Sequence, residues 1–180
     1  MNTGLYGLMA VFDEPEQLVE AAKKVRGQGY RVFDAYSPFP VEGLAEAMEL
    51  RPTWIAPICW IGGFLGAAGG FALQCYGTLV EFALNVGGRP LFSWPAYVPI
   101  TFELMILTAG TFTFLSILLL NRLPTYYHPV FNIEEFQKRN ANDGFFLVIE
   151  ARDSRFSRNE THELLRSLHP VRTYEVPDVP

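Results

Sequence analysis

Hydrophobic and polar positions divide this chain of 180 residues into three parts. Charged and apolar residues mix throughout 1–51 and 121–180, whereas 52–120 contains only three charged residues, Glu81, Arg89 and Glu103. Residues 53–76 carry no charge over 24 positions, which as a helix would span about 36 Å, against about 30 Å for a bilayer's hydrocarbon core. A second run, 96–120, is interrupted only by Glu103. We therefore predict transmembrane helices at about 53–76 and 96–120, joined by an outer loop at 77–95. The alternative is a buried helical hairpin in a soluble protein.

Basic residues predict the orientation of this hairpin. They are frequent before the first run, at Lys23, Lys24, Arg26, Arg31 and Arg51. They are frequent again after the second run, at Arg122, Lys138, Arg139 and five further arginines, while the intervening loop has only Arg89. Because Lys and Arg concentrate in cytoplasmic flanks, both termini are expected in the cytoplasm and the loop outside.

The first apolar run is unusually rich in glycine. Gly62, Gly66 and Gly70 recur every four residues, and Gly63 and Gly69 broaden the stripe. Glycine weakens a helix in water, but in lipid small residues let two helices approach closely. Two occupants suit this face, the chain's own second helix or a neighbouring subunit. Since the second helix offers only a short small-residue patch at 108–111, we expect the first helix to pack against another protein as well.

The two charged flanks show the same order of elements. Residues 5–13 ("LYGLMAVFD") read as a buried strand, followed by a helix that Asp13 and Glu16 would open as a capping box, and by a strand at 30–36. After the membrane pair, 144–151 ("GFFLVIEA") is a buried strand, Ser157 and Glu160 repeat the capping pattern, and 171–176 forms a last strand.

Two βαβ units of equal size predict an α+β fold, a ferredoxin-like sandwich. Its first and third strands should be central, because they are the apolar ones. The predicted layout is a first half-domain at 1–51, a transmembrane hairpin at 52–120 inserted between strands 2 and 3, and a linker with the second half-domain at 121–180. Each half exposes an apolar face that the other covers, so the two should fold together in the cytoplasm.

Composition argues against several kinds of chemistry. Cys59 and Cys75 lie sixteen residues apart on one predicted helix, about 24 Å, so they cannot form a disulfide with each other. The sequence has no CxxCH motif for covalent haem and no cysteine cluster for iron–sulfur. The formal net charge is −5, which gives no basic footprint for nucleic acid.

Three stretches carry a resemblance to a known family. They are "GGRPLFSWPAYVPITFE" (87–103), "YHPVF" (127–131) and "DGFFLVIEARDSRF" (143–156). Over nearly its full length the chain resembles the small two-helix membrane subunit, ActD, of bacterial alternative complex III, a quinol:electron-acceptor oxidoreductase. The resemblance implies a bacterial inner-membrane subunit with no redox cofactor of its own. It implies c-type haems and iron–sulfur clusters on other subunits, and as partners polytopic quinol-binding subunits and extracytoplasmic haem and iron–sulfur subunits.

A few residues are candidates for specific roles. Glu103 lies inside the second run, where a carboxylate is costly, so we expect an inter-helix or inter-subunit hydrogen bond, with a proton relay as the alternative. Glu81 is a second candidate for either role, unless it is a solvated loop carboxylate. Arg89 and Trp94, in a stiff proline-containing segment, could dock an extracytoplasmic subunit or simply anchor the loop. A lone His128 is weak evidence for a haem or metal ligand.

The residues alone predict a two-pass protein with an interacting domain. The resemblance implies more, a non-catalytic structural and assembly subunit of the quinol-oxidising complex that braces its quinol-binding membrane subunits. The alternative is a membrane-anchored ligand-sensing or transporter-accessory protein with a ferredoxin-like domain. Such a module would be expected to show a Cys/His cluster or a glycine-rich ligand loop, and the sequence shows neither.

Overall fold

The computed structural model describes residues 4–50, 52–85 and 87–178. The chain separates into two compact units, residues 1–51 with 126–180, and residues 52–125. Arg51, which the sequence analysis counted in the basic flank, lies outside the described residues. The predicted combination of a mixed α/β unit with two candidate membrane helices is confirmed.

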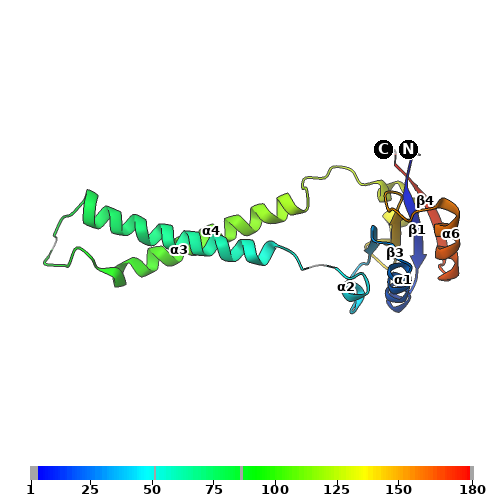
Figure 1. Cartoon of the computed structure of the whole chain (residues 1–180), viewed down its shortest axis with the longest axis horizontal. Helices are drawn as coiled ribbons and strands as arrows, with labels where there is room; N and C mark the ends of the chain where they lie inside the picture. The colour runs from blue at the N-terminus through cyan, green and yellow to red at the C-terminus, as the bar shows by residue number, and fades with distance from the viewer. Residues whose placement is uncertain (1–3, 51, 86, 179–180) are drawn as a thin grey trace. The chain divides into compact units, whose positions relative to one another are not determined.

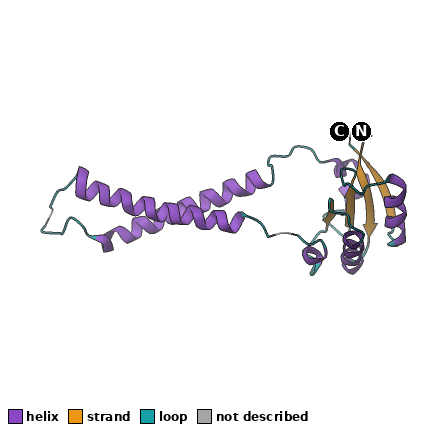
Figure 2. Ribbon diagram, viewed as in Figure 1, coloured by secondary structure: helices purple, strands orange, loops and turns teal. Residues whose placement is uncertain are grey.

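The first unit is built on a β-sheet, drawn orange in Figure 2. The sheet has four antiparallel strands in the order β2-β3-β1-β4. Its strands are β1 (Leu5–Phe12), β2 (Phe33–Tyr36), β3 (Phe145–Glu150) and β4 (Arg172–Pro177). The inner strands β1 and β3 approach closely at Gly7, where an added Cβ would overlap the Ile149 carbonyl oxygen and lie 3.1 Å from Glu150 Cα. A side chain at this position would therefore disturb the pairing of the two most buried strands.

Strand β2 is shorter than the predicted 30–36, and Asp153 explains why. The backbone N–H groups of Arg31 and Val32 each donate to Asp153 Oδ2 at 2.7 Å. Tyr30 instead turns into the core, where its hydroxyl lies 3.0 Å from Thr161 Oγ1. The strand therefore begins only at Phe33.

Helices α1 (Pro15–Gly27) and α6 (Arg158–Ser167) pack on one face of the sheet (Figure 1). The core between them and the sheet contains Leu8, Phe12, Leu18, Val25, Leu147, Ile149 and Leu165. The short α2 (Leu44–Ala47) adds Ala47 to the same core.

Neither predicted capping box forms. Helix α1 begins at Pro15, which suits the first helical position because its missing N–H would be unpaired there, and Glu14 is the N-cap. Asp13 pairs instead with Arg139 at 2.8 Å. Ser157 is the N-cap of α6 as the pattern suggested, but its side chain makes no capping bond; its backbone N–H donates to Thr161 Oγ1 at 3.2 Å.

The opposite face of the sheet is covered by a segment that the sequence analysis treated as linker. It contains η2 (Pro129–Asn132) and α5 (Glu134–Arg139). Val130 and Phe136 from this segment pack on Met9, Phe146 and Val148. Both faces of the sheet are thus buried, which accounts for the five consecutive apolar residues of β3, 145–149.

The second unit is a helical hairpin of α3 (Ile55–Tyr76), continued by the π-helix η1 (Gly77–Glu81), and α4 (Trp94–Leu120). The candidate spans Ile55–Glu81 and Trp94–Leu120 are 27 residues each, about 40 Å, long enough to cross a bilayer. Residues 77–81, predicted in the loop, are therefore helical, and α4 begins two residues earlier than the predicted 96. The connection between the helices is correspondingly shorter than predicted.

Candidate functional site

The contact between α3 and α4 is the most specific feature of the membrane unit. Three glycines one turn apart form the buried face of α3: Gly62, Gly66 and Gly70. A Cβ added at Gly66 would overlap Thr108 Oγ1 and lie 2.5 Å from the Leu104 carbonyl oxygen. One added at Gly62 would lie 2.7 Å from Phe112 Cβ, and one at Gly70 would lie 2.8 Å from Leu104 Cδ1. These glycines are therefore required for the chain's own hairpin.

The two other glycines of the predicted stripe behave differently. A Cβ at Gly63 would meet Ala109 Cβ at 3.7 Å, an ordinary contact. A Cβ at Gly69 would meet nothing within 4 Å. The stripe thus divides into an inner face that packs tightly on α4, an edge at Gly63 that lies at ordinary contact distance from α4, and an open position at Gly69. Of the two occupants considered from the sequence, the chain's own second helix takes the inner face; packing against another protein stays a prediction.

Polar groups inside the hairpin are satisfied across the same contact. Thr108 Oγ1 lies 2.9 Å from the Gly62 carbonyl oxygen and 2.7 Å from the Leu104 carbonyl oxygen, so its one proton is shared between the two helices. Because the glycines allow the backbones of α3 and α4 to approach closely, the Gly62 carbonyl oxygen lies within hydrogen-bond distance of the Thr108 side chain on α4.

A second polar cluster lies toward the loop end of the hairpin and was missed in the sequence. Gln74 Nε2 donates to the Tyr97 carbonyl oxygen and to Thr101 Oγ1, both at 3.1 Å. Thr78 Oγ1 bonds Tyr97 OH at 2.5 Å, and Tyr97 OH also lies 3.0 Å from the Leu91 carbonyl oxygen. An amide in the middle of an apolar run was the signal that could have found this cluster. Together these bonds fasten the end of α3 to the start of α4.

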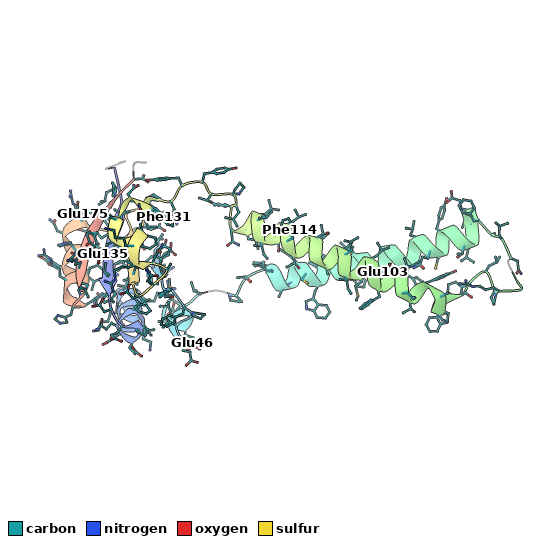
Figure 3. The ribbon with its side chains drawn as sticks, turned by 180° about the vertical axis from the view of Figure 1, so that it is seen from behind. Glu46, Glu103, Phe114, Phe131, Glu135 and Glu175 are labelled. Atoms are coloured by element: carbon teal, nitrogen blue, oxygen red, sulfur yellow. The ribbon has the colours of Figure 1, made fainter. Side chains whose placement is uncertain are left out.

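Glu103 lies on α4 outside both contacts (Figure 3). Its side chain is exposed, and no hydrogen bond or ion pair connects it to another residue in the described part of the chain. The predicted inter-helix bond within this hairpin is therefore not made, which leaves the inter-subunit and relay interpretations. Glu81 is the exposed last residue of η1, and in the described part of the chain no hydrogen bond or ion pair joins it to Glu103.

Arg89 and Trp94 lie at the loop end of the hairpin. Arg89 is exposed and lines a small cavity of about 170 Å³ together with Thr78, Phe82, Leu84, Pro90 and Leu91. Trp94 is the first residue of α4 and is 58% exposed. Among the described residues no hydrogen bond or ion pair engages either side chain, so both are exposed at the loop end of the hairpin.

His128 is part of an aromatic cluster on the sheet. Its ring meets Tyr6 and Tyr36 edge to face, with centroids 5.4 and 6.3 Å apart, and Nε2 lies 3.4 Å from Tyr6 OH. Burial, with Glu150 nearby, raises the pKa of Tyr6 to about 12. Burial also raises the pKa of Glu150, although its ion pair with Arg152 opposes the shift. These contacts give His128 a packing role at the start of the segment that covers the sheet.

The described residues hold no group of three or more His, Cys, Asp or Glu side chains suited to a metal ion. Cys59 and Cys75, on α3, are both free thiols.

Fold and hairpin together define a class of protein: a mixed α/β unit whose chain also provides two apolar helices, each long enough to span a membrane. The sequence model of the family described as alternative complex III, ActD subunit, matches residues 6–175. The chain belongs to this family and is thus a subunit of alternative complex III, associated with the other subunits of that complex. A search of curated proteins finds no match.

Proposed function

We propose that the chain is a non-catalytic structural and assembly subunit of a quinol-oxidising respiratory complex, and that its hairpin braces the quinol-binding membrane subunits. The observation that carries this proposal is the closed packing of the hairpin. At Gly66 the backbones of α3 and α4 are so close that a methyl group has no space, so a quinone ring has none either. The remaining surface of both helices is largely exposed and apolar, which suits contact with lipid and with other membrane subunits.

The α/β unit is proposed to be a ferredoxin-like domain with the hairpin inserted between its second and third strands. The strand order β2-β3-β1-β4 with antiparallel neighbours supports this interpretation, as does the packing of α1 and α6 on one face. The position of α3 and α4 between β2 and β3 in the chain supports the insertion. An inserted hairpin would tie the domain to the membrane at both ends of the inserted segment.

The proposed location is the bacterial inner membrane, with both termini and the domain in the cytoplasm. Lys and Arg residues in both flanks of the hairpin support this orientation. The loop that contains Arg89 would then lie outside. We propose that Arg89 and Trp94 dock an extracytoplasmic subunit, and that c-type haems and iron–sulfur clusters belong to such partner subunits.

Family membership favours this function over the ligand-sensing alternative. The test is purification of the tagged full-length chain in mild detergent, with identification of the proteins that accompany it and measurement of quinol oxidation. Polytopic and haem-containing subunits should accompany the chain in fixed ratio, together with quinol-oxidising activity. Recovery of the chain alone, or with transport proteins instead, would contradict the proposal.

A further inference from the structure

The α4 surface that faces away from α3 is formed by four exposed residues at helical spacing. Residues of α4 that meet the α3 glycines recur at positions 104, 108 and 112. Glu103, Ile106, Gly110 and Phe114 recur at intervals of three and four residues and share the other side of the helix. All four are exposed, Ile106 by 52% and Phe114 by 62%. Figure 3 labels Glu103 and Phe114 on this helix. We call Glu103, Ile106, Gly110 and Phe114 the outer face of α4.

Among the described residues of the hairpin, no ion pair or hydrogen bond neutralises Glu103. Between Pro52 and Leu120 the sequence contains a single basic residue, Arg89, which lies in the loop before α4. The next two threonine hydroxyls after Glu103 on α4 bond backbone carbonyls: Thr108 bonds those of Gly62 and Leu104, and Thr111 donates to the Leu107 carbonyl oxygen at 2.8 Å. Glu103 is nine residues into α4, about 13 Å along the helix axis. A carboxylate at this depth that faced lipid would be costly.

Gly110 is the second independent feature of the outer face. It lies seven residues, two helical turns, after Glu103, and a Cβ built on it would meet nothing within 4 Å. The hairpin therefore has no need of glycine here, unlike at Gly66. In a membrane helix an open glycine allows the backbone of another helix to come close.

We propose that the outer face of α4 binds a transmembrane helix of another subunit of the complex, and that this helix presents a hydrogen-bond donor or a basic side chain to Glu103. The carboxylate provides the charge complementarity, and Gly110 provides the close approach that a buried polar contact needs. The inference rests on the proposed function, because it identifies the surface through which the hairpin braces its neighbour.

The proposal is tested by the yield of intact complex on native gels from strains that carry variants of the full-length chain. Glu103→Leu leaves the partner's donor unpaired and should lower the recovered complex about three- to tenfold, the factor that one interhelical hydrogen bond provides. Glu103→Gln can still form the bond and should recover most of that loss. Gly110→Leu should also lower the yield, through steric exclusion of the partner helix. Thr111→Leu is the matched control, because the Thr111 hydroxyl is satisfied within its own helix, and it should leave the yield unchanged.

A photo-crosslinking amino acid at Ile106 identifies the partner directly in the purified complex. The crosslinked peptide should be a membrane span that contains a donor residue. A crosslink to a second copy of this chain, or no protein crosslink at all, would overturn the proposal. So would a normal yield from Glu103→Leu, or a Glu103→Gln complex that assembles fully and yet loses turnover, which would indicate proton transfer.

A strain that lacks the chain separates this inference from the proposed function. If removal of the chain lowers the yield of complex but Glu103→Leu does not, the outer-face contact is wrong while bracing stands. If removal of the chain leaves assembly and activity intact, bracing itself is wrong.

Discussion

Replacement of Gly66 by alanine adds one methyl group at the closest point between α3 and α4. That methyl group would overlap Thr108 Oγ1 and lie 2.5 Å from the Leu104 carbonyl oxygen and 3.0 Å from the Leu104 carbonyl carbon. Because two of these atoms belong to the α4 backbone, a rotamer change cannot relieve the contact and the helices must separate. Overpacking of this kind costs about 1–3 kcal/mol, a factor of roughly 5 to 150 in an equilibrium constant. Separation would also lengthen the 2.9 Å bond from Thr108 to the Gly62 carbonyl oxygen.

Gly69→Ala is the matched control on the same helix. A Cβ there meets nothing within 4 Å, so the change should alter stability by no more than about 0.5 kcal/mol. The assay is unfolding of the full chain in mixed micelles with increasing SDS, followed by loss of helical circular dichroism. Equal midpoints for Gly66→Ala and Gly69→Ala would refute the assignment of Gly66 to the contact within the hairpin.

Three further predictions concern the α/β unit and the orientation. Burial alone would raise the pKa of Asp153, but the backbone N–H groups of Arg155, Arg31 and Val32 donate to its carboxylate and lower the pKa overall. The contribution of Asp153 to stability is therefore present above about pH 4 and is lost as the pH falls through the lowered pKa. Asp153→Asn should therefore lower the free energy of unfolding by about 1–3 kcal/mol at pH 7 and reduce the acid sensitivity, as measured by thermal melts from pH 7 to pH 3. Tyr30→Phe removes the buried 3.0 Å bond to Thr161 and should cost about 0.5–1.5 kcal/mol in denaturant titration, and an unchanged midpoint would count against that bond. A reporter that is active only in the periplasm should be inactive when fused at Pro180 and active when inserted near Asn85, and the reverse result would exclude the proposed topology.

Hydrophobic pattern was sufficient to find the main elements. The predicted strand at 5–13 is one residue longer than β1 at one end, and the predicted strand at 144–151 is one residue longer than β3 at each end. The agreement is close because both strands are buried on two faces and read as nearly continuous apolar runs. The two apolar helices were equally visible, since a long run without charge has few alternatives.

Features set by distant contacts could not be read from pattern. β2 starts late because Asp153, more than 100 residues away, takes the N–H groups of Arg31 and Val32. Asp13 pairs with Arg139 instead of capping α1, and the segment with Val130 and Phe136 covers a sheet face that had no predicted cover. Local spacing carries no information on which distant residue will form a contact in the folded chain.

The glycine stripe shows the same limit within the candidate site. Sequence spacing predicts a close helix contact but does not identify the helix that makes it. In the structure Gly62, Gly66 and Gly70 of α3 contact α4, whereas a side chain at Gly69 would meet nothing within 4 Å. Glu103 was recognisable from its charge, whereas its direction away from α3 depends on the phase of α4 relative to those glycines.

The most direct test of the account compares cells with and without this chain. The amount of assembled complex is measured on native gels, and quinol oxidation is expressed per haem in the purified complex. A bracing subunit predicts a large loss of assembled complex, with the complex that remains turning over at the normal rate per haem. A normal amount of complex with lost turnover would contradict the account, because the chain would then take part in catalysis.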